Sequence, residues 1–307
     1  MPKLIRFVLP TLVLTMLLLL LLLMPSPQVT AHPALAPLAL RHRPQAPAEI
    51  GEFVAFCPFS HRAMDDPIVF PGMPGHSHNH DFFANVSTAA TTTLESLVAN
   101  GSTCDPAVDR SAYWIPTLYD ASDHIITVEQ ATFYYSVDIA NPSSLQPYPP
   151  GLKMIAGQAN ATSVPKPAYF KWSCLGAANS STTDFVVCPP GSKLELLLDF
   201  PDCWNGQDLD SADHKSHMAY SVNQACPASH PVAVPALQFK LRYATRGEAG
   251  MRLATGAAYT AHGDFFNAWD AAALNNRLNC LRQLIKCGPE GFAGSTSTFI
   301  YLPAVQK

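Results

Sequence analysis

The chain has 307 residues, a net charge of −4 and only 14% charged residues. It has no run of Lys or Arg, and clustered cations are the footprint of nucleic-acid binding, so we expect no nucleic-acid partner. The low charge, combined with many Ser, Thr, Asn and Pro residues, fits a secreted β-rich protein.

The first 50 residues have the pattern of a targeting segment and a linker. A basic start precedes an almost wholly apolar run over 7–24, and Val29 and Ala31 suit the −3 and −1 positions of a cleavage site. We predict a signal peptide over 1–31 and secretion, with an uncleaved membrane anchor as the alternative. No other membrane contact is expected. Residues 32–50 are rich in Pro and Ala and predict an extended linker.

The remaining sequence predicts a single globular domain over 51–290, with a C-terminal tail over 291–307. Its eight cysteines are even in number and include no CxxC pair, which favours disulfides over a zinc ribbon. The sequence leaves 105 pairings open. Our prediction is the local set Cys57–Cys104, Cys174–Cys188, Cys203–Cys226 and Cys280–Cys287.

Alternating β-branched and aromatic residues predict a series of strands. The segment 111–119 contains Pro116, which indicates an edge strand because proline donates no hydrogen bond to a neighbour. The long run over 123–139 predicts two strands. Further strands are expected over 51–60, 152–159, 168–174, 193–200 and 236–244.

Two helices are predicted. The first lies within 86–100, with Thr92 or Thr93 as its N-cap. The second lies within 268–288, where Ala, Leu and Arg recur at helical spacing before Gly and Pro end the helix. Together the elements predict a mainly β (α+β) fold, with a disulfide-stabilised sandwich-like core, long loops and a C-terminal helix.

Histidines gather in the segment 66–83, which reads DPIVFPGMPGHSHNHDFF. On an extended strand His76, His78 and His80 would point to one face, because alternate side chains share a face. Imidazoles in this arrangement are good ligands for copper or zinc, and nearby carboxylates orient them. A His-rich loop can also be only a hydrogen-bonded polar network.

A second polar cluster occupies 203–220 and contains His214 and His217, which a helical turn would place on one side. Solvated turns are the alternative for this Asp-rich segment. We expect the clusters to converge on one pocket, since separate buried polar groups are costly unless they satisfy each other. The predicted metal ligands are His76, His78, His80 and His217. The predicted catalytic residues are Asp66, Asp210, His214, His262 and Asp264.

Seven motifs occur in a recognisable order. They read DPIVFPG, GHSHNHDFF, AYWIPTL, LLLDFPDCWNG, DHKSHMAY, CPASHPVAVPAL and HGDFFNAW. This order resembles the secreted family called domain of unknown function nineteen-ninety-six over about 65–270, and the triple histidine resembles its bacterial members. The resemblance implies a secreted, disulfide-bearing domain with shared His, Asp, Trp and Cys positions, and it implies no assigned activity.

The residues favour some kinds of chemistry over others. There is no GxSxG elbow and the cysteines are expected in disulfides, so nucleophilic catalysis is disfavoured. Asp and His suit acid–base or metal-assisted hydrolysis, and neighbouring aromatic residues suit stacking on sugars. We therefore expect a hydrolase or lyase acting on a polysaccharide or other cell-surface ligand. The alternatives are a non-catalytic carbohydrate- or surface-binding module and a copper- or zinc-binding protein; whether the chain is an enzyme stays open.

Overall fold

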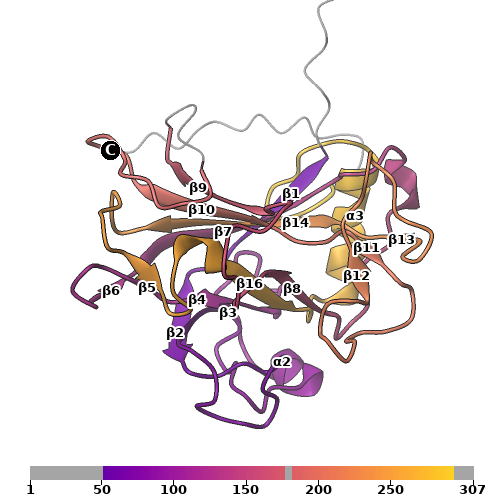
Figure 1. The fold of residues 1–307 in the computed structure, drawn as a ribbon. Coiled ribbons are helices and arrows are strands. Elements are labelled where there is room, and N and C mark those ends of the chain that lie inside the picture. Colours follow the sequence, from indigo (N-terminus) through magenta and orange to yellow (C-terminus); the bar gives the residue numbers. More distant parts are fainter. Residues whose placement is uncertain (1–50, 177–181, 294–307) are drawn as a thin grey trace, which may run out of the picture. The chain divides into compact units, whose positions relative to one another are not determined.

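The computed structural model describes residues 51–176 and 182–293 (Figure 1). The predicted signal peptide, the linker and most of the C-terminal tail lie outside the described residues. Within the described part of the chain, no helix has the length and apolar character needed to cross a membrane.

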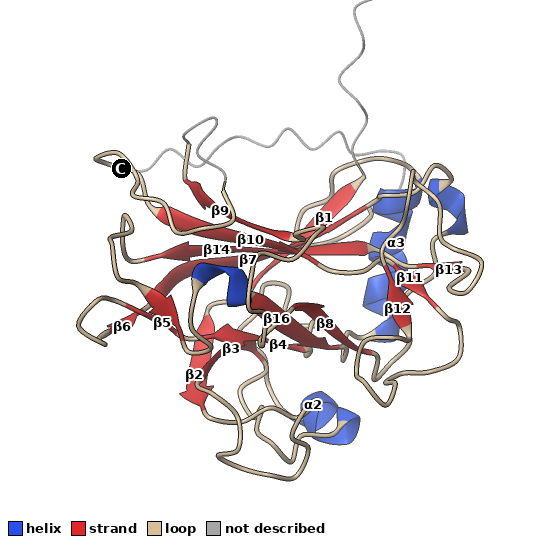
Figure 2. Cartoon of the chain, viewed as in Figure 1, coloured by secondary structure: helices blue, strands red, loops and turns tan. Residues whose placement is uncertain are grey.

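Two five-stranded antiparallel sheets form two layers (Figure 2). We call them sheet I and sheet II. Sheet I has the order β1 (Glu52–Phe56), β7 (Val128–Ser136), β14 (Ala236–Tyr243), β10 (Leu194–Asp199) and β9 (Phe170–Cys174). Sheet II has the order β2 (Phe59–Ala63), β3 (His80–Ala84), β4 (Ala112–Pro116), β16 (His262–Phe266) and β8 (Lys153–Gly157).

Smaller elements surround the two layers. One three-stranded sheet contains β15 (Arg252–Leu253), β5 (Leu118–Tyr119) and β6 (Ile125–Ile126), and another contains β12 (Met218–Ala219), β11 (Cys203–Trp204) and β13 (Val232–Ala233). The helices are α2 (Leu94–Ala99), α3 (Ala271–Arg282) and the short 3-10 turns η1 (Pro142–Ser144) and η2 (Ala258–Thr260).

The main core lies between sheet I and sheet II. Strand β14 shows why: every second residue is buried, as strand alternation requires when one face is covered. Across the interface, Tyr113 of sheet II stacks on Phe133 of sheet I, with ring centroids 3.9 Å apart. The predicted mainly β, sandwich-like fold with a C-terminal helix is confirmed.

All four predicted disulfides are present, namely Cys57–Cys104, Cys174–Cys188, Cys203–Cys226 and Cys280–Cys287. Each is expected to stabilise the fold by ~2–4 kcal/mol. Disulfides are typical of proteins from oxidising compartments, so this pattern is compatible with an extracellular protein.

One sequence prediction of local structure differs from the fold, and another is confirmed. Strand β4 is not an edge strand, because it pairs with both β3 and β16. Pro116 is tolerated there since it is the last residue of the strand, where the missing donor interrupts no central ladder. Helix α2 is short. Thr93, one of the two N-caps predicted for it, accepts a hydrogen bond from the Ser96 amide through its side chain.

A buried carboxyl group makes the core sensitive to pH. Asp109 is fully buried, and its carboxylate accepts a hydrogen bond from the Tyr113 hydroxyl at 2.5 Å and from the Ser111 amide at 3.1 Å. Burial raises the pKa of Asp109 to about 6, although these hydrogen bonds act in the opposite direction. The folded state therefore holds this proton more tightly than the unfolded state.

We predict that Asp109→Asn removes a pH dependence of stability. Because the folded pKa lies above the unfolded one, the contribution of Asp109 is full below the unfolded pKa of 3.8 and is lost as the pH rises through about 6. Between pH 4 and pH 7, the free energy of unfolding of the wild type should fall by about 2 kcal/mol more than that of the variant. Urea unfolding at both pH values measures this, and parallel changes in the two proteins would contradict it.

Candidate metal centre

The strand order of sheet II places His80 of β3 and His262 of β16 on either side of β4. His80 of β3 pairs with Pro116 of β4, and Asp264 of β16 pairs with Trp114 of the same strand. Since alternate residues share a face, His80, His262 and Asp264 all project from the same side of the sheet. This is the side that faces away from sheet I, and both histidine-bearing strands flank β4.

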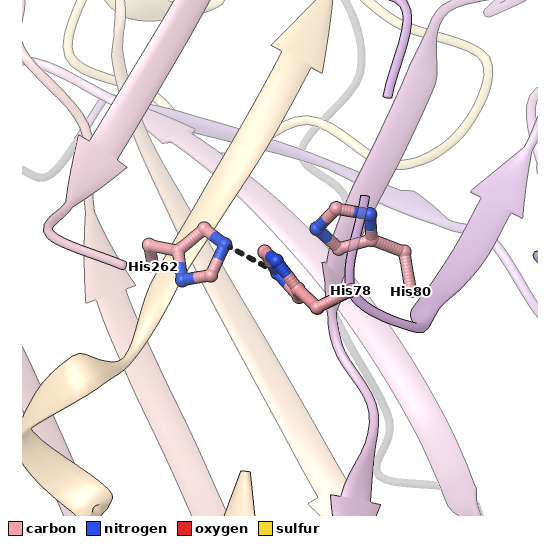
Figure 3. A group of neighbouring side chains, drawn as sticks. All are labelled: His78, His80 and His262. Atoms are coloured by element: carbon pink, nitrogen blue, oxygen red, sulfur yellow. Dashed lines mark hydrogen bonds between the residues drawn. The ribbon is translucent and has the colours of Figure 1, made fainter. Parts of the chain in front are cut away.

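His78 reaches the same place from a loop. Strand β3 begins only at His80, so the expectation that three alternating histidines share one strand face is wrong. The physical reason is the turn-forming approach, in which Gly72 and Gly75 both adopt φ of +74°. The loop nevertheless brings the Nε2 atom of His78 to 3.1 Å from the Nε2 atom of His262 (Figure 3).

The three side chains form what we call the histidine triad: His78, His80 and His262. One ring nitrogen from each lies within 4.8 Å of the other two. The ring centroids of His78 and His80 are 4.1 Å apart, and those of His78 and His262 are 4.9 Å apart. This spacing allows one ion to contact all three rings, given metal–nitrogen bonds of ~2 Å.

Backbone carbonyls fix the tautomers of two triad members. The Nδ1 atom of His80 donates to the Asp65 carbonyl at 2.9 Å, and Nδ1 of His262 donates to the Thr260 carbonyl at 2.9 Å. A carbonyl can only accept, so the proton is on Nδ1 and Nε2 carries a lone pair; that of His262 faces the Nε2 atom of His78. The Nε2 atom of His80 is buried without any hydrogen-bond partner. Metal-binding histidines are oriented in this way.

Burial also keeps the triad uncharged. It lowers the pKa of His78 to about 4 and that of His262 to about 3, and it holds the pKa of His80 well below its usual range. Neighbouring imidazoles lower the last two further. At neutral pH the three rings are neutral, which is the form that binds metal.

Two carboxyl groups lie beside the triad. Atoms of Asp66, His80 and Asp264 also gather within 4.8 Å. Asp66 Oδ1 accepts hydrogen bonds from the amides of Ile68 and Val69, whereas Asp264 Oδ2 is buried without a partner. Burial raises the pKa of both carboxyl groups, and that of Asp264 strongly. Asp264 and His80 lie close together, and each has one buried atom without a hydrogen-bond partner, which fits a bound cation.

A polar border surrounds this centre. Asp210 bonds the Lys153 ammonium at 3.1 Å and His214 Nδ1 at 2.8 Å, and both Lys153 and His214 lie close enough to lower the pKa of Asp66. Lys215 similarly lowers the pKa of Asp264. The sequence reasoning missed both lysines, because an isolated Lys gives no signal of its neighbours in space.

Two of the predicted metal ligands lie outside the triad. His76 is exposed, with Nδ1 3.4 Å from the Pro74 carbonyl. His217 is buried, but its Nε2 donates to the Lys153 carbonyl at 2.6 Å and its Nδ1 is 2.8 Å from the Ser211 hydroxyl. Both ring nitrogens of His217 therefore make hydrogen bonds that hold the surrounding loop in place. His214 and His217 also do not share a helical turn, since the segment forms irregular turns and His214 has φ of +59°.

Gly157 lets β8 approach the triad closely. It pairs with His262 and has φ of +76°, and a Cβ atom there would lie 2.1 Å from the Ala261 carbonyl oxygen and 2.7 Å from the His262 Cα atom. Only glycine fits this combination of conformation and space.

We predict that Gly157→Ala destabilises the protein by ~3 kcal/mol, the sum of backbone strain and the displacement of β16. It should also weaken metal binding, because His262 has to move. Urea unfolding and metal titration measure the two effects. Gly191→Ala is the matched control, since Gly191 has φ of +84° but no atom near the added Cβ. Equal losses in both variants would show that the contact with His262 is unimportant.

The chain was compared with known proteins. The model of the family described as Domain of unknown function (DUF1996) matches residues 66–269, which include the triad and both carboxyl groups. Comparison with curated proteins and with solved structures gave no match.

Proposed function

Because the chain belongs to the Domain of unknown function (DUF1996) family, whose description assigns no activity, we propose a function from its geometry. The protein binds a transition-metal ion, zinc or copper, through His78, His80 and His262. The proposal rests above all on one observation: the Nε2 atom of His80 is buried, unprotonated and without a hydrogen-bond partner, with the rings of His78 and His262 close by.

The donor set selects the kind of metal. Imidazole nitrogens suit zinc and copper, whereas calcium and magnesium prefer oxygen ligands throughout. Asp264 is the residue placed to supply a further donor, because its free Oδ2 atom is buried next to His80. The three histidine nitrogens supply three of the four positions that zinc prefers, and Asp264, which groups with His80 but not with the whole triad, would have to move to supply the fourth.

The burial of the triad favours retention of the ion over turnover of a polymer at this centre. His80 is fully buried and His262 is 3% exposed, while His78 is half-buried. A catalytic metal keeps one coordination position open to substrate, whereas a structural or captured metal is enclosed by protein ligands. A polysaccharide hydrolase or lyase using these residues is therefore the less supported alternative. We therefore propose that the protein is exported and binds metal. The four disulfides support the export.

Metal analysis of the purified protein tests this proposal. The full chain, produced without a His tag, would be stripped with chelator, incubated with zinc or copper(II) and dialysed, and its metal content measured by mass spectrometry. We expect about one equivalent of one of these metals per chain. His76→Ala, which changes an exposed histidine outside the triad, should retain it. Retention of no metal, or equal retention by a His78→Ala/His80→Ala variant, would overturn the proposal.

A further inference from the structure

A cleft lies on the outer face of sheet I, away from the histidine triad. Its volume is about 610 Å³, and its lining includes Glu52 of β1, Gln238 of β14 and Asp199 of β10. These three side chains project outward because the alternate residues of each strand are buried in the core. Further lining residues come from the segments that lead into and out of the strands.

An aromatic pair stands beside this cleft. Tyr169 and Tyr220 stack face to face, with ring centroids 3.4 Å apart and an angle of 1° between the planes. Both rings also line a second cleft of about 370 Å³, together with Lys166 and Lys215. The two clefts are therefore neighbours, separated by the tyrosine pair, and together form what we call the double cleft.

Polar groups in the larger cleft have hydrogen-bonding capacity to spare. Asp202 is 3% exposed; its Oδ1 atom accepts from the Ser221 amide at 2.7 Å, but its Oδ2 atom has no partner. Asp199 accepts from the Gln238 amide group at 2.6 Å, and Asp138 is an exposed carboxylate on the lining. The Oδ2 atom of Asp202 lies below the surface of the cleft, whereas the carboxylates of Asp138 and Asp199 on the lining can accept further hydrogen bonds from a ligand.

The arrangement does not fit a single cation or a polyanion. Among the described residues, the groups whose ligand atoms gather within 4.8 Å include none of the carboxylates of this cleft. Glu52, Asp138, Asp199 and Asp202 leave the larger cleft acidic despite Lys240, so an acidic polymer would be repelled. A neutral ligand rich in hydroxyl donors, with an apolar face for a tyrosine ring, meets both conditions.

We propose that the double cleft binds a segment of a neutral oligosaccharide, with sugar rings against Tyr169 and hydroxyl groups donating to the carboxylates of Asp138 and Asp199. The neighbouring clefts favour a chain of several sugars over a single sugar. This site does not depend on the proposed metal function, since it uses none of the triad residues, although its smaller part borders Ile155 and Gly157 of β8 in sheet II.

Calorimetric titration of the metal-loaded full chain tests this site. The probes are the hexasaccharides of cellulose, chitin, xylan, mannan and β-1,3-glucan, with the galacturonic acid hexamer as the acidic comparison. We expect at least one neutral probe to bind with submillimolar Kd and the acidic probe not to bind. Tyr169→Ala should weaken binding about tenfold. Phe59→Ala, an exposed aromatic residue on sheet II, is the matched control and should bind as the wild type does.

Asp138→Asn provides a second variant, because this exposed residue can change without disturbing the core; we expect a severalfold loss of affinity. Absence of binding by every neutral probe, preference for the acidic probe, or unchanged affinity in both cleft variants would overturn the proposal. Repeating the titration on chelator-treated protein separates the two sites. Sugar binding that persists when no metal can be loaded would refute the metal centre alone.

Discussion

Replacing His262 with Gln is expected to weaken zinc binding by about 1,000-fold. The variant keeps a side chain of similar length but removes one of three imidazole nitrogens, and a structural zinc site in a peptide gains ~10–16 kcal/mol from about four ligands. Loss of one ligand therefore costs ~2.5–4 kcal/mol, and the upper end of this range corresponds to a 1,000-fold change in Kd. Competition with a chromophoric chelator at pH 7 measures the affinity directly.

The control for this substitution is His124→Gln. The side chain of His124 is 80% exposed and its imidazole contacts Asp120, outside the triad. The control should bind zinc as the wild type does. If His262→Gln bound zinc with wild-type affinity, then the 3.1 Å contact between the Nε2 atoms of His78 and His262 would be an ordinary hydrogen bond and not an empty ligand pair.

Removing the metal is expected to lower the thermal stability of the protein substantially. An ion that binds only the folded state stabilises it by ~4.1 kcal/mol when its free concentration is 1,000 times Kd. For a domain of this size, each kcal/mol shifts Tm by about 2–4 °C. Chelator-treated protein should therefore unfold roughly 8–16 °C below the zinc-loaded protein, as measured by calorimetry.

The His262→Gln variant also tests the source of this stabilisation. Its Tm should rise by only about 1–2 °C at the same zinc concentration, because a site weakened 1,000-fold is then only about half occupied and stabilises the fold by ~0.4 kcal/mol. A chelator effect of equal size in variant and wild type would place the stabilising ion elsewhere. The disulfides stay oxidised in both preparations, so they do not contribute to the difference.

The two proposed sites meet at Lys215. This side chain lines the smaller part of the double cleft, and its ammonium group donates to the Gly157 carbonyl at 2.5 Å, next to His262. It also lowers the pKa of Asp264.

Local patterns in the sequence determined much of this protein. Alternation identified the strands, Thr93 was one of the two caps expected for the first helix, and the local pairing of eight cysteines was correct, because these features depend on neighbours along the chain. The histidine run also indicated a polar site.

Only the tertiary structure decided which histidines meet. His78 and His262 are 184 positions apart, and they meet because β3 and β16 both flank β4. Periodicity tells which face a residue occupies but not which strands become neighbours, and it carries no information about the free nitrogen of a ring. The backbone bonds that orient His80 and His262 exist only in the folded chain. His78 rather than His76 joins the triad because a loop containing Gly72 and Gly75, both with φ of +74°, precedes β3.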